Sequence, residues 1–565
     1  LSAEASGRGK PGWVDSEERA AALRELTDRF AGSLQFGTAG LRGQLGAGPN
    51  RMNRAVVVRA AAGLMAYLTE QAGPAPRVAI GFDARHGSRQ FALDTAQVVT
   101  AAGGRAWLLP GPCPTPLLAH AVRAVKADAG VMVTASHNPA ADNGYKVYLG
   151  GRAATDAGEG VQIVPPADSL IAEQIAAAPP ARLVPRSQTG WRELDATAVD
   201  GYLDRAVVAL GDDVNQARPD LRIVHTAMHG VGGSIALAAF EDAGFSDVVS
   251  VVEQARPDPD FPTVAFPNPE EPGAIDLALA KARAVAADLV IAHDPDADRC
   301  AAAVFDPRLG DWRMLTGDEV GALLGEQVAV AWRTRLAYEP AALAADNQNP
   351  TLACSIVSSM LLQKIATHHG LAFAQTLTGF KWIARTPGLV FGYEEAIGYC
   401  VRPDLVRDKD GITAGLALAD LAAGAKAAGG SLLELLDDLA RRHGLHLTGQ
   451  VALRYSNPAD LTAAVDRIVN APPTELAGNT VSRTVNLAEG FNGLPPTAGI
   501  ALWTEAGSRL IIRPSGTEPK VKCYLEVVQA VDPAASFAEL TALRLQASAW
   551  LERLADDARK LLDTQ

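Results

Sequence analysis

The sequence lacks the features that mark secreted, membrane-spanning or zinc-cluster proteins. Its five cysteines are odd in number and scattered, and none forms a Cys-x-x-Cys pair, so a disulfide framework and a zinc cluster are not indicated. No run of about 18 uninterrupted apolar residues occurs, and the polar N-terminal stretch lacks the apolar core of a signal peptide. We therefore expect a cytoplasmic protein with reduced cysteines and no membrane association.

An excess of positive charge is also missing. Lys and Arg number 51 against 64 Asp and Glu, which gives a formal net charge of −13. This balance argues against a broad nucleic-acid surface, which needs clustered basic residues. It leaves room for an anionic small molecule, because a few converging Arg, Lys and backbone N–H groups reverse the potential locally.

The chain is long enough for several domains of an α/β protein. Its 565 residues exceed what one core supports, so three or four domains are expected, and the composition is globular, with 48% hydrophobic and 20% charged residues. Short β-branched runs alternate with Ala- and Leu-rich helical stretches, a pattern typical of parallel or mixed sheets. Strands are predicted over residues 78–82, 130–134, 221–225, 289–292, 389–391, 510–512 and 521–527.

Helices and domain boundaries are predicted from caps and Pro-rich segments. Helices are expected over residues 16–30, 54–71 and 272–286, and another begins at Thr316, where Thr-Gly-Asp-Glu has capping-box spacing. Boundaries are expected near residues 165–190 and after His443, and the Pro472-Pro473 pair is expected in a loop of the last domain.

The first candidate site is TASHNP at residues 134–139, followed by Asn-Gly-Tyr-Lys ending at Lys146. A serine after a buried strand, with His137 and Lys146 nearby, suits a nucleophile, which needs a neighbouring base or cation. An equally open interpretation is that Ser136 caps a turn and Asn-Pro starts a loop.

The second candidate is DPDADR at residues 294–299, directly after a predicted strand. Alternating aspartates in a tight loop direct hard oxygens toward one point, which suits Mg²⁺ or Ca²⁺. An EF-hand is excluded, because its sixth position needs Gly and is Arg299, and its twelfth needs Glu and is Phe305. The alternative is a solvated acidic turn, but three carboxylates this close repel one another without a cation.

Three further segments supply groups for binding an anion or a sugar. RPSGTEPK at residues 513–520 combines Arg, hydroxyls and Gly as in a phosphate cradle, although a hairpin turn is the alternative. The pair Glu394 and Glu395 in FGYEEAIG suits hydrogen bonds from sugar hydroxyls or acid–base work. TGFK (378–381) and RDKDG (407–411) would add positive charge nearby, although for any one of their residues a solvated charged loop is the more ordinary interpretation. The Gly-rich segments FGTAGLRG (36–43) and HGVGG (229–233) are weaker signals.

Together these motifs suggest phosphoryl transfer on a polyhydroxylated phosphate ester. In their order along nearly the whole chain they also resemble those of the α-D-phosphohexomutases, in particular the long phosphoglucomutase-2/phosphopentomutase-like branch with its actinobacterial members. The resemblance implies a heart-shaped α/β architecture of three related mixed-sheet domains and a smaller C-terminal α+β domain. The implied domains are 1–195 with the phosphoserine loop, 196–307 with the metal loop, 308–443 with the sugar-recognition loop and 444–565 with the phosphate-binding loop.

The resemblance also implies roles for individual residues. Ser136 would carry the phosphoryl group and, with Asp294, Asp296 and Asp298, contact Mg²⁺. His137, Lys146 and Arg299 would be catalytic, with Lys146 as base if nearby cations depress its pKa. The implied substrate-binding residues are Arg42, Lys381, Glu394, Glu395, Lys409, Arg513, Ser515, Gly516 and Thr517.

The implied reaction interconverts hexose 1-phosphate and hexose 6-phosphate, for glucose or mannose, through a bound hexose 1,6-bisphosphate. Alternatives are a phosphopentomutase acting on ribose or deoxyribose phosphates, and a glucose-1,6-bisphosphate synthase that uses a separate phosphoryl donor. A non-catalytic sugar-phosphate sensor disagrees with the intact Ser136, Lys146 and aspartates. Many relatives have a serine within the EEAIG segment, and some have a histidine at Tyr399, so the sugar stays open. The expected partner is a small sugar phosphate, and the protein would be a monomer or homodimer.

Overall fold

A computed structural model of the chain describes residues 17–154, 157–208, 218–338, 349–455, 457–514 and 520–563. The chain divides into two compact units, and each is described by itself. The first unit consists of Leu1–Val214, Arg222–Cys300 and Arg402–Leu416. The second consists of Asn215–Leu221, Ala301–Val401 and Ala417–Gln565.

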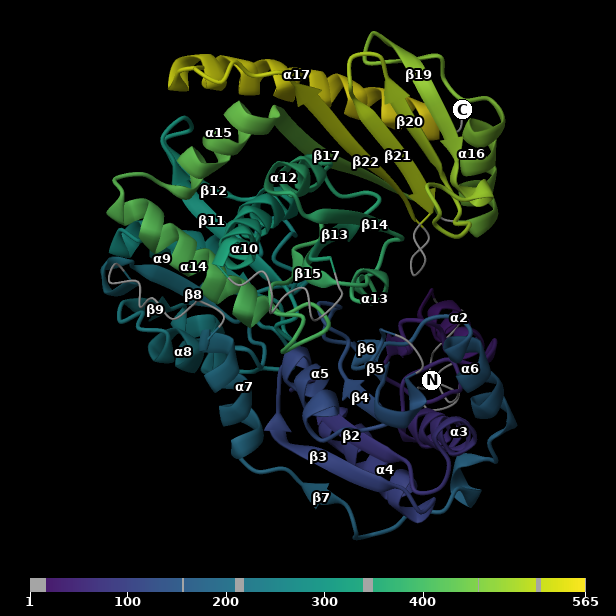
Figure 1. Cartoon of the computed structure of the whole chain (residues 1–565). Helices are drawn as coiled ribbons and strands as arrows, with labels where there is room; N and C mark the ends of the chain where they lie inside the picture. The colour runs from purple at the N-terminus through teal and green to yellow at the C-terminus, as the bar shows by residue number, and fades with distance from the viewer. Residues whose placement is uncertain are drawn as a thin grey trace. The chain divides into compact units, whose positions relative to one another are not determined.

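The first unit begins with a mixed seven-stranded sheet (Figure 1), in which β2 pairs in parallel with β3 and β4, while β5 pairs antiparallel with β4, β1 and β6. Strand β2 is buried along nearly its whole length, as expected for a central parallel strand. The strands are β1 (Leu41–Gln44), β2 (Arg77–Phe82), β3 (Arg105–Pro112), β4 (Ala129–Val133), β5 (Asp142–Leu149), β6 (Val161–Gln162) and β7 (Arg192–Glu193).

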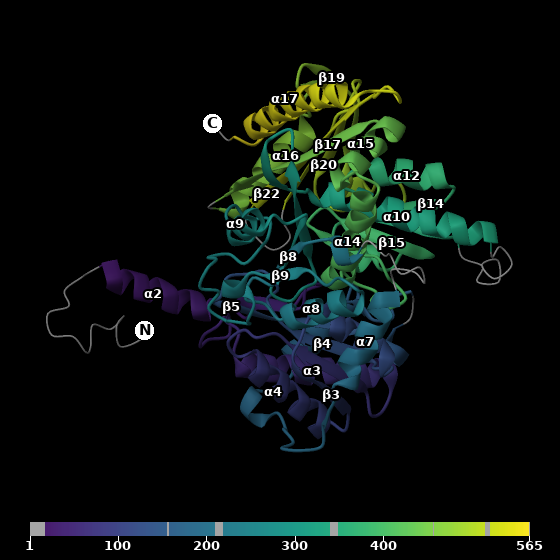
Figure 2. The ribbon, with the colours of Figure 1, turned by 90° about the vertical axis from the view of Figure 1, so that its left-hand side faces the viewer.

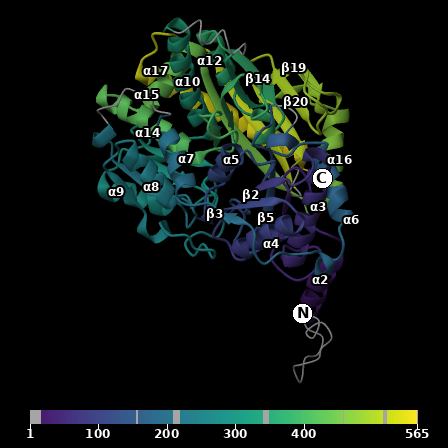
Figure 3. The ribbon, with the colours of Figure 1, turned by 60° about the horizontal axis from the view of Figure 1, so that its bottom comes forward.

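Helices pack against this sheet and close its core. The Asn53 side chain caps α3 by accepting hydrogen bonds from two backbone N–H groups. Apolar residues of α3 and α4 form one buried cluster with the central strands, and α3 lies beside α4 and α6 (Figure 3). The helices are α3 (Arg54–Ala72), α4 (Ser88–Ala101), α5 (Thr115–Ala124), α6 (Ala167–Ala177) and α7 (Thr197–Val207). Figure 2 shows α2 (Glu17–Phe30), of which only Ala22 is buried, projecting from the rest of its unit.

One expected domain boundary is wrong in part. The Pro-rich segment at residues 165–190 contains α6, which packs closely on α3. A Cβ atom at Gly63 of α3 would come within 2.5 Å of the Ile175 backbone nitrogen, so only glycine permits this approach. The segment therefore belongs to the first domain rather than separating it from the next.

The first unit also contains three parallel strands of a second sheet, in which β8 (Ile223–Thr226) pairs with β9 (Val248–Ser250) and β10 (Leu289–His293). Helices α8 (Gly233–Asp242) and α9 (Asp276–Val285) connect them. Helix α9 starts later than the predicted residue 272, because Gly273 adopts a left-handed φ of +82° in the preceding turn.

The long middle segment of the second unit begins within β11 (Cys300–Asp306), which forms a hairpin with β12 (Asp311–Met314). Helix α10 (Gly317–Tyr338) follows, and Thr316 and Glu319 form the predicted capping box. The next sheet has the strand order β14-β13-β15-β16, with β13 parallel to both neighbours. Its elements are β13 (Thr351–Ser355), α12 (Leu361–His369), β14 (Ala372–Thr376), α13 (Phe380–Ile383), β15 (Leu389–Glu394) and β16 (Gly398–Cys400).

The chain ends in an antiparallel six-stranded sheet of order β17-β22-β21-β20-β19-β18. Helix α17 (Phe537–Leu562) packs on β17 and β22 (Figure 1) and closes a separate apolar core. The other elements are α14 (Gly411–Ala427), α15 (Leu432–His443), β17 (Leu445–Arg454), α16 (Pro458–Asn470), β18 (Glu475–Leu476), β19 (Asn479–Asn486), β20 (Ile500–Thr504), β21 (Arg509–Pro514) and β22 (Lys520–Gln529). The Pro472-Pro473 pair lies in the predicted loop between α16 and β18.

Among the described helices, none alone has the length and apolar composition of a membrane span. Helices α14 and α15 pass that test only as a pair with a sharp bend between them.

Asp128 offers a test of the first sheet, because its fully buried carboxylate accepts hydrogen bonds from the backbone N–H groups of Arg77 and Arg152 and pairs with both guanidinium groups. Burial raises the pKa of this carboxyl, but the two arginines outweigh it and hold the pKa well below its ordinary value. We expect Asp128→Asn to destabilise the unit by about 2–3 kcal/mol, seen as a lower melting temperature.

The melting difference between wild type and Asp128→Asn should stay constant from pH 8 to about pH 5. It should shrink below about pH 4, since a lowered folded-state pKa stabilises only where the unfolded state is also ionised. The control is Asp204→Asn, at an exposed position of α7. A difference that grows as the pH falls toward 4 would contradict the assignment.

Candidate active site

Ser136 lies just after β4 in a turn that holds its backbone in an unusual conformation. Its φ of +52° is in the left-handed region, which costs a non-glycine residue roughly 1–2 kcal/mol and is frequent at functional sites. The Ser136 N–H donates to Thr134 Oγ1 at 2.8 Å, and Arg85 Nη2 donates to the Ser136 carbonyl at 2.6 Å. These bonds present a buried hydroxyl at the carboxyl end of the sheet.

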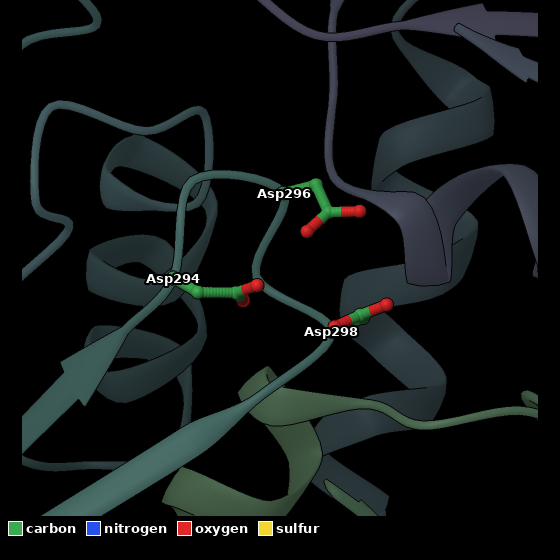
Figure 4. A group of neighbouring side chains, drawn as sticks. All are labelled: Asp294, Asp296 and Asp298. Carbon is green, nitrogen blue, oxygen red and sulfur yellow. The ribbon is translucent and has the colours of Figure 1, made fainter. Parts of the chain in front are cut away.

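The aspartate loop lies between β10 and β11 and carries all three predicted carboxylates. Figure 4 shows Asp294, Asp296 and Asp298 on one tight turn after β10. One carboxylate oxygen from each lies within 4.8 Å of the others, and all three side chains are buried. The Arg299 N–H donates to Asp294 Oδ1 at 3.1 Å and closes the turn.

Hydrogen bonds join the serine turn to the aspartate loop. Ser136 Oγ donates to Asp294 Oδ2 at 3.0 Å. Lys146 Nζ, on β5, donates to Asp296 Oδ2 at 2.7 Å and to Asp298 Oδ2 at 3.0 Å. Thr115, at the start of α5, donates its hydroxyl to Asp296 Oδ2 at 2.6 Å. Two segments about 150 residues apart thus form one site.

The aspartate loop fits a divalent cation. Asp296 Oδ1 and Asp298 Oδ1 are buried and have no hydrogen-bond partner among the described residues. An unsatisfied buried carboxylate oxygen is costly, and hard oxygen ligands are those that Mg²⁺ prefers. Asp294, Asp296, Asp298 and the Ser136 hydroxyl are therefore a donor set suited to such a cation.

The three carboxylates have different pKa shifts. Burial, together with repulsion from Asp296 and Asp298, raises the pKa of Asp294 well above its ordinary value. Burial also acts to raise the pKa of Asp296 and Asp298, but Lys146 lowers both, helped by the Thr115 hydrogen bond at Asp296 and by Lys409 and Arg299 at Asp298, so that both pKa values are lowered. Lys146 thus compensates part of the negative charge of this loop.

The two residues predicted to transfer protons, Lys146 and His137, have pKa values shifted in opposite directions. Burial acts to lower the pKa of Lys146, but Asp296 and Asp298 outweigh it and the pKa is raised. The sequence predicts Lys146 as a base only on the condition that nearby cations depress its pKa, and its nearest charges among the described residues are carboxylates. Burial, together with Arg299 and Arg42, lowers the pKa of His137 well below its ordinary value, and His137 Nδ1 lies 3.2 Å from Ser136 Oγ.

Three cationic side chains predicted from the sequence lie in the same unit. Arg42, on β1, donates to Asn138 Oδ1 at 3.1 Å. Lys409 Nζ lies 3.4 Å from Asp298 Oδ2, and Arg299 Nη1 lies 3.3 Å from Glu270 Oε2. Three cationic groups therefore lie beside Ser136 and the aspartates, an arrangement that suits an anionic ligand.

The Gly-rich segments act through close packing. A Cβ atom at Gly40 would approach the Tyr145 carbonyl oxygen to 1.9 Å, so glycine lets β1 carry Arg42 close to β5. In the HGVGG segment, the Val231 N–H donates to the Pro295 carbonyl at 2.8 Å, and a Cβ at Gly230 would lie 2.4 Å from Pro295 Cα. That segment therefore packs against the aspartate loop at Pro295.

The second unit holds the predicted sugar-recognition residues. Glu394 ends β15, and Glu395 follows it with its Oε2 accepting hydrogen bonds from the hydroxyls of Ser355 and Ser358, each at 3.0 Å. Burial, then repulsion from Glu394 and Asp318, raises the pKa of Glu395 to about 7. Tyr399 is fully buried and stacks on Tyr393, so its ring is part of the core of this sheet.

Part of the predicted phosphate cradle lies within the described chain. Arg513, on β21, donates to the hydroxyls of Thr378 and Thr497, which brings the TGFK segment with Lys381 next to β21. Burial lowers the pKa of Arg513. Ser515, Gly516 and Thr517 lie outside the described residues.

Several residues of these sites were not predicted from the sequence. In the first unit Thr115 donates to the Asp296 carboxylate and Arg85 to the Ser136 backbone carbonyl, and in the second Ser355 and Ser358 donate to Glu395. A signal for Arg85 exists, since Asp83-Ala-Arg85 follows a predicted strand just as the aspartate loop does. Ser355 and Ser358 also end a strand, but small hydroxyl residues there are too common to stand out.

Comparison with known proteins gives a consistent result along the chain. The phosphoglucomutase/phosphomannomutase alpha/beta/alpha domains I, II and III match residues 33–179, 200–307 and 317–443, and the C-terminal domain of that family matches residues 450–542. These matches agree with the three mixed α/β sheets and the final antiparallel sheet.

Individual relatives support the same assignment. A probable phosphomannomutase of Haemophilus influenzae is 42% identical, over 84% of this chain and 93% of its own, and a mouse phosphopentomutase is 33% identical, over 89% and 85%. A solved structure of a putative phosphomannomutase from Thermus thermophilus matches 94% of this chain and all of its own with a TM-score of 0.68 at 23% identity, which shows the fold. The chain is therefore a member of the phosphoglucomutase/phosphomannomutase family.

Proposed function

We propose that the chain is a phosphosugar mutase that interconverts hexose 1-phosphate and hexose 6-phosphate through a phosphoserine at Ser136. The observation that supports this most is the 3.0 Å contact between Ser136 Oγ and Asp294 Oδ2, inside a buried carboxylate cluster. Family membership supports the same chemistry.

In the first half-reaction, the bond between Ser136 Oγ and phosphorus breaks while a bond forms between phosphorus and a hydroxyl oxygen of the sugar phosphate. The sugar hydroxyl gives up its proton, and Ser136 Oγ gains one. In this proposal His137, whose Nδ1 lies 3.2 Å from Ser136 Oγ, and Lys146 carry these protons. The bound bisphosphate then reorients within the site and returns its other phosphoryl group to Ser136.

Mg²⁺ is the cation that we propose for Asp294, Asp296, Asp298 and Ser136, and when bound it would neutralise the phosphoryl charge. Arg299 and Lys409 would add positive charge at the reacting group, and Arg42 would contact the ligand beside it. Glu394, Glu395 and Lys381 would contact the sugar. Arg513 with Ser515, Gly516 and Thr517 would bind the non-reacting phosphate, whose binding energy orients the sugar.

The proposed substrates are glucose and mannose phosphates. The probable phosphomannomutase is 42% identical, whereas the phosphopentomutase, phosphoribomutase and glucose 1,6-bisphosphate synthase relatives are 31–34% identical. A pentose phosphate or a separate phosphoryl donor is the second candidate, since those relatives cover as much of the chain.

Ser136→Ala should lower mutase activity on glucose 1-phosphate by at least about a thousandfold, because no other described hydroxyl donates to Asp294. Activity is measured by coupled detection of hexose 6-phosphate. Ser482→Ala, which removes an exposed hydroxyl of β19, is the matched control and should keep full activity. A fully active Ser136→Ala would overturn the proposed function.

Chelation of divalent cations should abolish turnover, and added Mg²⁺ should restore it. Asp298→Asn should weaken Mg²⁺ binding at least about tenfold in titration calorimetry, since it removes a charged ligand. Asp204→Asn serves as the control. Undiminished binding to Asp298→Asn, or turnover after full chelation, would contradict the assignment of the aspartate loop.

A substrate panel separates the candidate activities. We expect kcat/KM to be at least about tenfold higher for glucose 1-phosphate or mannose 1-phosphate than for ribose 1-phosphate, because hexose hydroxyls absent from ribose would bind Glu394 and Glu395. A preference for ribose 1-phosphate would identify a phosphopentomutase. Net synthesis of the bisphosphate only with an added phosphoryl donor would identify a synthase.

A further inference from the structure

The loop between β13 and α12, Ser355–Met360, contacts a predicted sugar-recognition carboxylate on one side and the C-terminal sheet on the other. Toward the sugar site, the Ser355 and Ser358 hydroxyls each lie 3.0 Å from Glu395 Oε2. The Glu395 N–H also donates to Ser358 Oγ at 3.2 Å. The loop therefore sets the orientation of the Glu395 carboxylate and of its backbone.

Toward the C-terminal sheet, two facing residues of β21 and β22 grip the backbone of this loop. Arg509 donates from Nη1 to the Ile356 carbonyl at 3.0 Å and from Nη2 to the Ser358 carbonyl at 2.6 Å. Glu526 Oε1 accepts from the Met360 N–H at 2.9 Å. Arg509 and Glu526 are partners in the strand register and form an ion pair at 2.8 Å. Both are buried, so these charge-assisted bonds are shielded from solvent.

Further contacts attach the loop to the same sheet. Ser359 Oγ donates to Glu526 Oε1 at 2.7 Å, and His446 Nδ1 lies 2.9 Å from the same oxygen. Ile356 and Val357 are buried in an apolar cluster with Ile511 of β21. These contacts fix the backbone of the loop relative to the C-terminal sheet.

The strand that grips the loop also leads to the predicted phosphate cradle. Arg509, Ile511 and Arg513 alternate along β21, so they share one face of the strand. Arg509 and Ile511 contact the loop, while Arg513 contacts Thr378 in the same unit. One face of β21 thus bears both the residues that contact the loop, Arg509 and Ile511, and the first residue of the predicted cradle, Arg513.

We propose that Arg509 and Glu526 are positioning residues that act on Glu395 through the Ser355–Met360 loop. This inference rests on the proposed mutase function, in which Glu395 contacts a sugar hydroxyl. The C-terminal sheet then contributes twice to substrate binding: it carries part of the phosphate cradle, and it holds the sugar-recognition carboxylate of the preceding domain in place.

The charges around Glu395 make the two serine hydroxyls important. Glu394 and Asp318 oppose its ionisation, while Lys522 favours it and Arg513 interacts with it. Burial raises the pKa of Glu395 to about 7, so ionisation near neutral pH depends on the donors that it retains. Loss of both hydroxyls should raise this pKa further, which a role limited to packing would not do.

A double-mutant cycle tests the proposal in the full-length protein with glucose 1-phosphate. Arg509→Lys keeps the charge but loses the fork that spans two carbonyls, and the pair Ser355→Ala with Ser358→Ala removes the other end of the connection. Each should lower kcat/KM about tenfold, whereas their combination should lower it less than about thirtyfold, because both act through one carboxylate. The control is Arg559→Lys, an exposed arginine of α17, which should change nothing.

The pH dependence provides the second measurement. In the serine double variant the acidic limb of the kcat/KM profile should shift to higher pH by about half a pH unit or more. The inhibition constant of inorganic phosphate, which probes the cradle, should change less than about twofold. Additive losses near a hundredfold, or an unmoved acidic limb, would overturn the inference. If circular dichroism shows that Arg509→Lys is unfolded, the pH profile of the serine variant decides alone.

The wild type and Ser136→Ala are assayed first, so the two proposals fail in distinguishable ways. An inactive wild type, or an active Ser136→Ala, removes the mutase proposal and this inference with it. A normal wild type with additive losses in the cycle removes only the role of Arg509 and Glu526.

Discussion

The main constraint on this structure is that three carboxylates lie close together in one buried loop and must be stabilised there. Asp294, Asp296 and Asp298 repel one another, and burial deprives them of water. Lys146 compensates part of this charge from another strand, and two carboxylate oxygens are left without a hydrogen bond among the described residues. Such a cluster suits a divalent cation, and in the proposed function that cation would lie beside a phosphorylated Ser136. The rest of the first unit is arranged to keep these groups together.

Turns at the ends of strands bring the groups of this site together. The left-handed conformation of Ser136 and the glycines that pack against Pro295 allow two loops to approach each other at the carboxyl ends of parallel strands. In the second unit, Glu395 directly follows β15, Arg513 lies near the end of β21, and the Ser355–Met360 loop links Glu395 to the C-terminal sheet. In both units, rigid sheets position short polar loops, which suits a reaction that depends on the orientation of a bound sugar.

Much of this was predictable from local sequence patterns. The serine turn, the aspartate loop and the capping box at Thr316 depend on residues close together in the chain, so their motifs were visible. Contacts between distant segments were not. Nothing near Thr115 indicates that its hydroxyl reaches Asp296, and the Pro-rich stretch at residues 165–190 resembled a linker although α6 packs on Gly63. The charge environment of Lys146 was equally hidden, because it is set by carboxylates about 150 residues away.

The central claim is that Ser136 carries the phosphoryl group. It is tested most directly by intact-mass analysis of wild type and Ser136→Ala after incubation with glucose 1,6-bisphosphate and Mg²⁺, followed by peptide mapping. The account predicts that wild type gains the mass of one phosphoryl group on the peptide containing residues 134–139 and that Ser136→Ala gains none. Phosphorylation of Ser136→Ala at another residue, with mutase activity retained, would contradict it.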